Sequence, residues 1–247
     1  MEPQLELCKE IVSQVKSNYD MAVDCDDIQQ LQKLQDALSK LPPNLVKVCG
    51  INNLGFKDQG VSKEYYPNHG YYVDNKLVLN TQLITDPQVF VDPSGRTLDR
   101  FEHTLYHEMG HGFDEEVGGG PGREASLDPE WLELSGWSKE PDDGRSKLVL
   151  KSASTLQHRF SRVSDLARTL SKKAGTAKIV IREQGSPELV GEWYYDPKEG
   201  FPRFYAKRNP WDDYADCFAF YVGGLKGFLP ANKIAYFDKA LKAYLGG

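Results

Sequence analysis

The segment HTLYHEMGHGFDEE (residues 103–116) carries three of the five histidines of the chain within nine positions. Its centre, HEMGH (residues 107–111), has the form H-E-x-x-H. In a helix, positions i and i+4 lie on one face, so the imidazoles of His107 and His111 can reach the same ion. Glu108 follows at about 100° around the helix, where it can accept a proton from a water on that ion. The spacing predicts a zinc site with a general base beside it, since zinc favours nitrogen donors and an open position for water.

An ordinary helix is the alternative, because H-E-x-x-H also arises in helices that bind no metal. Two glycines in the motif region, Gly110 and Gly112, argue for the metal site. Each glycine destabilises a helix interior by about 1 kcal/mol relative to alanine. A purely structural helix has no evident reason to contain two, whereas small residues would leave space beside the histidines.

A zinc site of this kind needs a further ligand from elsewhere in the chain, and NPWDDYADCFAFYV (residues 209–222) offers three aspartates. Asp212 and Asp213 could simply stabilise the start of a helix through its dipole. Asp216 lies a turn further in, among apolar residues, where a carboxylate requires a partner. The free N–H of a metal-bound histidine is the usual one. The residues alone leave open which aspartate binds the metal.

Together, these motifs resemble the zinc metallopeptidases related to anthrax lethal factor and the Pro-Pro endopeptidases. In that family, a later E-x-x-A-E motif follows the H-E-x-x-H helix, and a catalytic tyrosine lies seven residues before its first glutamate. The matching positions here are DDYAD (residues 212–216) and Tyr205. The resemblance implies that Asp212 is the third zinc ligand, that Asp216 supports a zinc-bound histidine, and that Tyr205 stabilises the oxyanion.

The resemblance covers roughly residues 25–115 and 200–230. It implies an α+β, zincin-like metallopeptidase fold with a small mixed sheet, an active-site helix and C-terminal helices. It also implies a zinc-dependent endopeptidase (Zn²⁺ as cofactor) that acts on a peptide or protein substrate with Glu108 as the base.

One segment ahead of the active-site helix, HGYYVDNKLVLN (residues 69–80), is similar to the substrate-side strand of the family. An extended substrate would add to this strand by backbone hydrogen bonding. Tyr71, Tyr72 and Val73 are therefore the expected substrate-binding residues.

The sequence departs from the family pattern at the aspartates, because the family has glutamate at both positions. Aspartate is one methylene shorter, so the second helix must lie closer to the metal, or Asp213 takes over as a ligand or supporting group. We favour Asp212 as the ligand because it shares a helical face with Asp216.

The second departure is the length of chain between His111 and Asp212, which exceeds the usual spacing of the family. It predicts a single catalytic domain over residues 1–247 with an inserted subdomain at about 118–200. Such an insertion could restrict access to the cleft or read the substrate.

Patterns around the motifs predict the elements that position them. We expect two helices between residues 5 and 41, strands at 44–56 and 71–80 with a turn inside the second, and a helix capped by Thr97 or Asp99 that ends near residue 118. Further along we expect a helix at about 153–174, a strand at 177–183, a helix entered at Pro210, and a last helix over 232–245.

Composition excludes several classes of function. The chain has 247 residues, a net charge of −6 and no basic stripe, which argues against nucleic-acid binding. It has no apolar run long enough to span a membrane. No signal peptide is visible, so we expect a secreted or periplasmic protein if an export signal was removed, and a cytoplasmic one otherwise.

Cysteines and tryptophans are expected to be structural. No CxxC pair occurs, so buried free thiols are expected, with a Cys25–Cys49 disulfide as the alternative. The four tryptophans are expected to anchor the core or the insertion: Trp131, Trp137, Trp193 and Trp211.

Two alternatives to general proteolysis remain. One is an inactive or structural zinc-binding module, although Glu108 would serve no purpose in a closed structural site. The other is a toxin-like peptidase directed at one specific partner protein.

Overall fold

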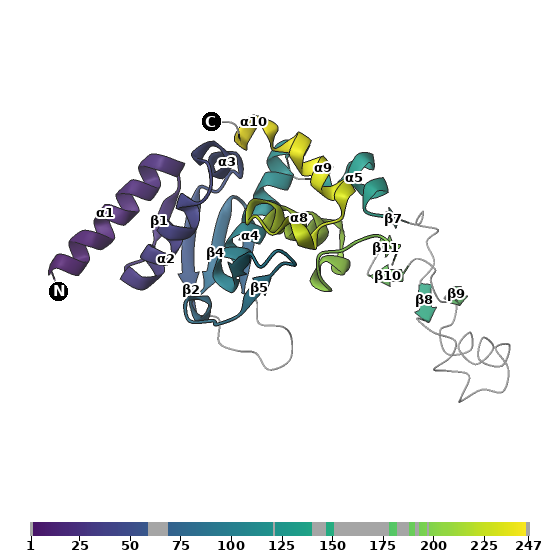
Figure 1. Cartoon of the computed structure of the whole chain (residues 1–247), viewed down its shortest axis with the longest axis horizontal. Helices are drawn as coiled ribbons and strands as arrows, with labels where there is room; N and C mark the ends of the chain where they lie inside the picture. The colour runs from purple at the N-terminus through teal and green to yellow at the C-terminus, as the bar shows by residue number, and fades with distance from the viewer. Residues whose placement is uncertain are drawn as a thin grey trace, which may run out of the picture. The chain divides into compact units, whose positions relative to one another are not determined.

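The computed structural model describes residues 2–58, 69–120, 122–139, 147–150, 178–181, 188–190, 193–196 and 198–245 (Figure 1). The chain divides into two compact units, Met1–Trp131 with Phe201–Gly247, and Leu132–Gly200. The insertion expected at about 118–200 overlaps the second unit, but the residues up to Trp131 belong to the first.

The first unit contains most of the helices and one four-stranded sheet. Its helices are α1 (Glu2–Tyr19), α2 (Ile28–Ser39), α3 (Pro43–Val48), α4 (Arg100–Gly118), α8 (Pro210–Val222), α9 (Ala231–Ala240) and α10 (Lys242–Leu245), and α5 (Pro129–Leu134) begins at its end. Its strands are β1 (Ala22–Asp24), β2 (Asn53–Lys57), β3 (Gly70–Val73), β4 (Lys76–Asn80), β5 (Val89–Val91) and β6 (Thr97–Asp99). Short 3-10 turns complete it: η1 (Thr81–Ile84), η2 (Ala125–Leu127), η3 (Tyr205–Arg208) and η4 (Lys226–Phe228).

The main sheet is mixed, with the strand order β1-β2-β4-β3. β1, β2 and β4 run parallel, and β3 pairs antiparallel with β4 across a two-residue turn at Asp74 and Asn75. Both turn residues have positive φ, as this tight hairpin turn requires. The expected hairpin at 71–80 is confirmed, and β3 is an edge strand of the sheet.

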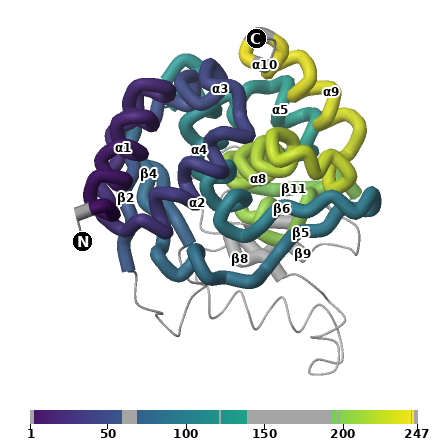
Figure 2. Tube along the Cα trace, turned by 60° about the vertical axis from the view of Figure 1, so that its left-hand side comes forward, coloured from purple at the N-terminus to yellow at the C-terminus, as the bar shows by residue number. Residues whose placement is uncertain are grey.

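The helices at the N-terminus form as the apolar spacing indicates. Asp27 caps the start of α2, and its side chain accepts hydrogen bonds from the N–H groups of Gln29 and Gln30. Its buried face carries Leu31 and Leu34, and α1 lies beside it (Figure 2).

The strand expected at 44–56 is only partly correct. Residues 43–48 form the helix α3, and the strand β2 begins at Asn53. Pro43 occupies the first turn of α3, where its fixed φ suits a helix and its missing N–H is not needed. Short apolar runs such as Leu45-Val46 fit either a buried helix or a strand. Here Pro42 and Pro43, at the start of the segment, favour the helix.

The helix α4 carries the H-E-x-x-H motif and packs against α8 as well as against β3 and β4 (Figure 1). The Asp99 carboxylate caps it by accepting from the N–H of Glu102, and Gly119 ends it in the left-handed conformation. α8 begins at Pro210 with Asn209 as its cap. The expected starts of both helices are thus confirmed.

Gly110 and Gly112 of α4 have a packing role that was not expected from the sequence. A Cβ on Gly110 would lie 2.9 Å from the Cα of Ala215 in α8. A Cβ on Gly112 would lie 2.1 Å from the carbonyl oxygen of Cys49. The glycines therefore allow neighbouring backbone to approach α4, rather than leaving space at the site.

Most of the described elements of the second unit are strands. β7 (Trp137–Lys139), β10 (Glu188–Val190) and β11 (Trp193–Tyr195) form an antiparallel sheet, and β8 (Lys147–Leu150) pairs in parallel with β9 (Lys178–Ile181). β9 corresponds to the strand expected at 177–183. The helix expected at 153–174 lies outside the described residues.

The chain is therefore an α+β protein with a small mixed sheet and several helices. All four cysteines are free, so the alternative of a Cys25–Cys49 disulfide is wrong. Within the described ranges, no helix combines the length and the apolar character that crossing a membrane would require.

Candidate metal centre

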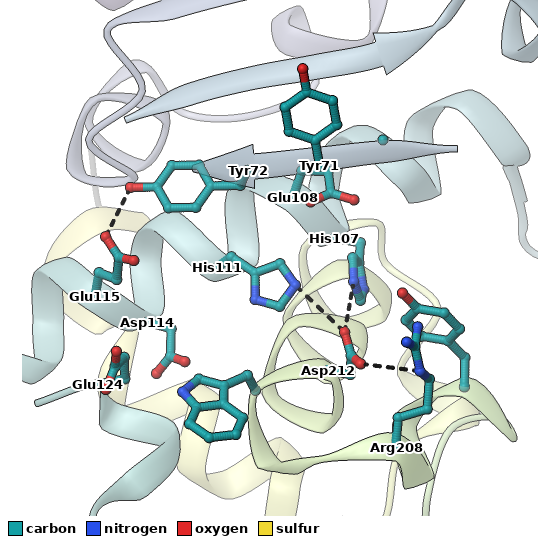
Figure 3. Close-up of a pocket in the computed structure, with 13 residues that line it drawn as sticks. Tyr71, Tyr72, His107, Glu108, His111, Asp114, Glu115, Glu124, Arg208 and Asp212 are labelled. Atoms are coloured by element: carbon teal, nitrogen blue, oxygen red, sulfur yellow. Dashed lines mark hydrogen bonds and ion pairs between the residues drawn. The ribbon is translucent and has the colours of Figure 1, made fainter. Parts of the chain in front are cut away.

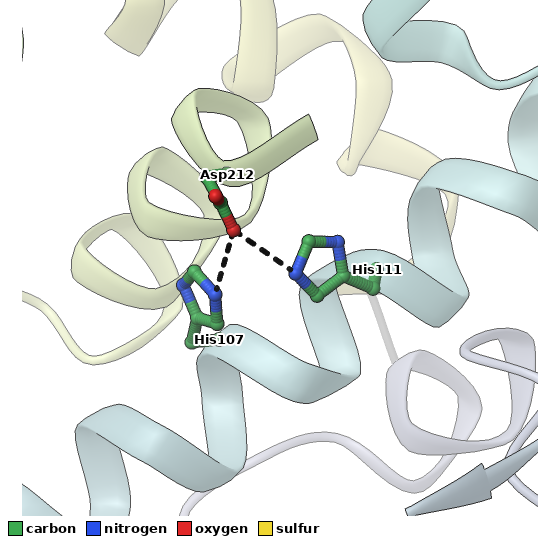
Figure 4. A group of neighbouring side chains, drawn as sticks. All are labelled: His107, His111 and Asp212. Carbon is green, nitrogen blue, oxygen red and sulfur yellow. Dashed lines mark ion pairs between the residues drawn. The ribbon is translucent and has the colours of Figure 1, made fainter. Parts of the chain in front are cut away.

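Three side chains from α4 and α8 converge on one point. The Nε2 atoms of His107 and His111 each lie 3.7 Å from Oδ1 of Asp212 (Figure 4). Among the described residues, these three form the group of histidine, cysteine and acidic side chains whose ligand atoms all lie within 4.8 Å of one another. The structure thus brings together the three residues that the sequence assigned as ligands.

The donor set suits a divalent metal ion such as zinc. Zinc–ligand distances of about 2.0–2.1 Å in a tetrahedron place the donor atoms roughly 3.3 Å apart. The 3.7 Å separations are close to that value and longer than a hydrogen bond. Two imidazole nitrogens and one carboxylate oxygen also leave a fourth tetrahedral position for water or substrate.

The aspartate reaches the histidines because the two helices approach closely. Contact of Gly110 with the backbone of Ala215 brings α8 against α4, which compensates for the shorter side chain of Asp212. The other oxygen of Asp212, Oδ2, accepts a hydrogen bond from the side chain of Asn209 at 2.8 Å and lies 3.8 Å from Nε of Arg208. Asn209 and Arg208 therefore hold the carboxylate with Oδ1 toward the rings.

The second aspartate on this face, Asp216, contacts His107, as expected of a group that would support this ring as a ligand. Its Oδ1 lies 2.8 Å from Nδ1 of His107, which directs the Nε2 atom of that ring toward Asp212. Arg203 donates to both oxygens of Asp216, from Nε at 2.7 Å and from Nη2 at 2.6 Å. Burial alone would raise the pKa of Asp216, but His107 and Arg203 hold it well below its usual value.

Arg203 is a site residue that the sequence analysis missed. A buried carboxylate that accepts a hydrogen bond from one histidine can still accept others. The expected burial of Asp216 could therefore have indicated a further donor, such as an arginine. The guanidinium of Arg203 also lies 4.8 Å from the centre of the Tyr205 ring, so one side chain contacts both Asp216 and the tyrosine.

The two histidines differ in their protonation. Burial would lower the pKa of His107, but Asp216 and Asp212 raise it to about 10. Burial and the neighbouring His107 charge lower the pKa of His111 to about 4. In the metal-free protein, His107 is therefore a cation held between two aspartates, and a metal ion must displace its proton to bind.

The expected base, Glu108, lies at the wall of the pocket beside the sheet edge. Burial raises the pKa of its carboxyl to about 7, while the backbone N–H of Tyr72 favours the charged form. A Cβ on Gly70 would lie 3.1 Å from Cγ of Glu108. The absence of a side chain at Gly70 therefore leaves room for the Glu108 carboxylate beside β3. A carboxyl with this pKa can both accept and return a proton near neutral pH.

The expected oxyanion donor, Tyr205, lies on η3 directly beside the histidines. Its ring packs edge-on against that of His107 with centroids 5.5 Å apart. The guanidinium of Arg208 lies 4.6 Å from the ring centre. Burial and the charge of Asp212 raise the pKa of Tyr205 to about 12, so its hydroxyl stays protonated and can donate a hydrogen bond.

The structure corrects the assignment of Asp213. Both of its oxygens accept hydrogen bonds from Nζ of Lys233, at 2.7 and 2.8 Å, in a fully buried ion pair. Asp213 is adjacent to Asp212 in sequence but lies about 100° further around α8. It therefore joins α8 to α9 and neither binds at the metal centre nor supports a ligand.

A pocket of about 340 Å³ opens beside the centre, lined by residues of β3, α4, η3, α8 and the loop before η2 (Figure 3). Of the expected substrate-binding residues, Tyr71 and Tyr72 line it, whereas Val73 does not and is half exposed. Trp211 also lines the pocket, which corrects its expected role as a core anchor. The other three tryptophans are buried, as expected.

Three acidic residues form one end of this pocket: Asp114, Glu115 and Glu124. Asp114 is buried, and burial together with the charges of Glu124 and Glu115 raises its pKa to about 7 against the hydrogen bonds from Ser126. The run Asp-Glu-Glu directly after the metal motif was visible in the sequence, but its position in the pocket was not inferred.

The raised pKa of Asp114 makes stability depend on pH. Because the folded-state pKa lies above the unfolded value of 3.8, the folded chain keeps a proton between about pH 4 and pH 7 that the unfolded chain has lost. The free energy of unfolding therefore falls as pH rises through this window, by roughly 4 kcal/mol at most. Asp114→Asn should remove this loss and be more stable than the wild type at pH 8.

Urea unfolding of the metal-free proteins between pH 4.5 and pH 8.5 measures this effect. The difference between wild type and Asp114→Asn should grow up to about pH 7 and then level off. Glu116→Gln, which removes an exposed charge from the same helix, should give a curve parallel to that of the wild type. If the free energy of unfolding of Asp114→Asn also changed with pH in parallel with that of the wild type, ionisation of Asp114 would not destabilise the fold.

Comparison of the chain with family models, with curated proteins and with solved structures finds no match.

Proposed function

We propose that this chain is a zinc-dependent endopeptidase of the zincin type, similar in its motifs to anthrax lethal factor and the Pro-Pro endopeptidases. One observation carries the proposal. Two imidazole nitrogens from α4 and one carboxylate oxygen from α8 converge beside Glu108, at the wall of an open pocket.

His107, His111 and Asp212 would hold the zinc ion. When bound, zinc supplies Lewis acidity, which activates water and polarises the scissile carbonyl. Asp216 and Arg203 keep His107 in the orientation that points Nε2 at the ion.

Proton transfer is assigned to Glu108. Its carboxylate accepts a proton from the attacking water and returns it to the amine that leaves. The buried position suits both steps, and in the metal-free protein burial raises the pKa of this carboxyl, which favours uptake of a proton from water.

Stabilisation of the developing negative charge is assigned to Tyr205. The hydroxyl remains protonated, and its ring is held between His107 and the guanidinium groups of Arg203 and Arg208. A hydrogen bond made only as the carbonyl becomes tetrahedral would contribute a few kcal/mol, on the order of one oxyanion-hole donor.

The edge strand β3 offers the means of holding an extended peptide. His69 and Asn80 are joined by a hydrogen bond on the β4 side, so the backbone groups of Gly70 and Tyr72 face away from β4. They lie at the pocket, next to Glu108. A substrate that adds to this edge would run past the metal centre.

Metal removal tests the proposal. The purified protein should contain about one zinc ion per chain and should cleave peptides in an unbiased peptide library analysed by mass spectrometry. Treatment with a zinc chelator should abolish cleavage, and added zinc should restore it. Bound zinc without cleavage of any peptide would instead favour the structural zinc module, and absence of zinc binding would reject the proposal.

A further inference from the structure

The pocket has a second polar feature besides the metal centre. We name Asp114, Glu115 and Glu124 the acidic end of the pocket. Figure 3 shows them together on one side, with Arg208 on the other. Asp114 and Glu115 belong to α4, and Glu124 comes from the loop that precedes η2.

Within the described residues, two buried carboxylate oxygens at this end accept no hydrogen bond of normal geometry, although the hydroxyl of Ser126 lies near Asp114. Oδ1 of Asp114 accepts from the backbone N–H of Ser126 at 2.6 Å, and Oε1 of Glu124 accepts from that of Gly122 at 2.9 Å. The second oxygens, Oδ2 of Asp114 and Oε2 of Glu124, are buried without a partner. Asp114 is 1% exposed. Buried acceptors without donors are uncommon, and here two of them belong to residues that line one pocket.

The negative charges of the acidic end have no cationic partner among the described residues, and their mutual repulsion contributes to the raised pKa of Asp114. No lysine or arginine of the described residues forms an ion pair with Asp114, Glu115 or Glu124. Among the described residues, Glu115 accepts a side-chain hydrogen bond only from the neutral hydroxyl of Tyr72, at 3.2 Å. A zinc ion at the centre would offset the charges of Asp212 and Glu108, which lie next to it, and would leave the acidic end negative.

The arrangement fits an organic cation better than a second metal ion. Within the described part of the chain, the group that converges tightly enough for an ion is His107, His111 and Asp212, and the acidic end does not converge in this way. A guanidinium carries five N–H donors in a planar fork, and an ammonium carries three. Either can donate to separate oxygens on different residues, as Asp114 and Glu124 present them.

We propose that the acidic end binds the cationic side chain of a lysine or arginine in the peptide substrate. This rests on the proposed peptidase function and names the substrate class of that site. Asp114 follows His111 by three residues, which is about 4.5 Å along the helix axis. An extended peptide advances about 3.3 Å per residue, so the basic residue lies within about three positions of the bond that is cleaved.

Cleavage specificity provides the first test. Library cleavage sites should be enriched in lysine or arginine within about three residues of the cut. For a cleaved peptide, N-acetylated and C-amidated, replacing that residue by glutamine should lower kcat/KM about tenfold or more, as expected for loss of a charged hydrogen bond. Asp114→Asn and Glu124→Gln should remove most of this preference, and Asp114→Glu should retain part of it.

Matched controls separate the local effect from net charge. Glu116→Gln removes one exposed charge from the same helix and should preserve the preference for basic peptides. Peptides with a free N-terminus but no lysine or arginine test whether the acidic end recognises the α-amino group instead of a basic side chain. If only these are cleaved efficiently, the cation is the chain terminus and the proposal of a basic side chain is overturned.

Binding of a small cation gives a readout that needs no hydrolysis. Agmatine, which carries a guanidinium, should bind to the zinc-loaded Glu108→Gln protein in titration calorimetry. Adding Asp114→Asn should weaken this binding about tenfold or more, and Glu116→Gln should not. Calcium binding at the acidic end without agmatine binding would overturn the proposal.

The two hypotheses fail in different ways. If no peptide is cleaved but agmatine binds in a manner that depends on Asp114, the peptidase function is wrong and the cation site stands. If peptides are cleaved without any preference for basic residues and agmatine does not bind, the peptidase function stands and the acidic end has no role in recognition.

Discussion

The substitution Glu108→Gln is expected to lower kcat/KM by about 10²- to 10⁴-fold while zinc stays bound. Glutamine has nearly the same shape, so it fits against Gly70 and β3 as the glutamate does. It cannot accept the proton of the attacking water. The three ligand side chains are unchanged, so the zinc content should remain about one ion per chain.

Kinetics with a peptide taken from the library measure kcat/KM, and metal analysis of the same sample measures the zinc content. Glu116→Gln is the matched control, since it makes the same chemical change on an exposed face of α4. It should keep both activity and zinc. Hydrolysis at the wild-type rate by Glu108→Gln would refute the assignment of the base.

The second large effect is expected at Asp212. Asp212→Ala removes the oxygen that faces both Nε2 atoms and leaves two histidines from one helix. Zinc affinity should fall by at least ~100-fold, beyond the roughly 10- to 100-fold typical of groups that only orient a ligand. Activity at limiting zinc should be lost with it. Competition with a chromogenic zinc chelator measures the affinity.

Asp213 provides the decisive comparison, because the sequence left open which of the two aspartates is the ligand. Asp213→Asn alone would leave the charge of Lys233 buried, at a cost of about 3–5 kcal/mol. Asp213→Asn combined with Lys233→Met removes both charges of the pair. This double variant should fold and retain zinc affinity within a few fold, and loss of zinc in it with retention in Asp212→Ala would reverse the assignment.

The local features of the site were readable from the sequence. The i, i+4 spacing of His107 and His111 depends only on helical periodicity, and the cap at Asp99 depends only on neighbours in the chain. The shared face of Asp212 and Asp216 follows from the same periodicity. Each of these predictions concerns residues within one or two helical turns, where backbone geometry leaves few alternatives.

The parts of the fold that were predicted incorrectly involve choices that local patterns do not settle. Leu45 and Val46 suit a strand or a helix, and the prolines before them started α3. Gly110 was taken as space at the site, yet its role is contact with Ala215, which lies about a hundred positions further along the chain. Only the packing of α4 on α8 shows how an aspartate can reach the histidines.

The sequence by itself determined which groups share a helix, namely two imidazoles and a carboxylate on one helix and acidic residues on a second, and from these the zinc chemistry is proposed. Tertiary structure decided which groups meet: Arg203 on Asp216, Lys233 on Asp213, and Glu124 beside Asp114. The reason is physical. Helical spacing is fixed by backbone hydrogen bonds between near neighbours, whereas contacts between distant segments depend on how whole elements bury their apolar faces and satisfy the charges they enclose.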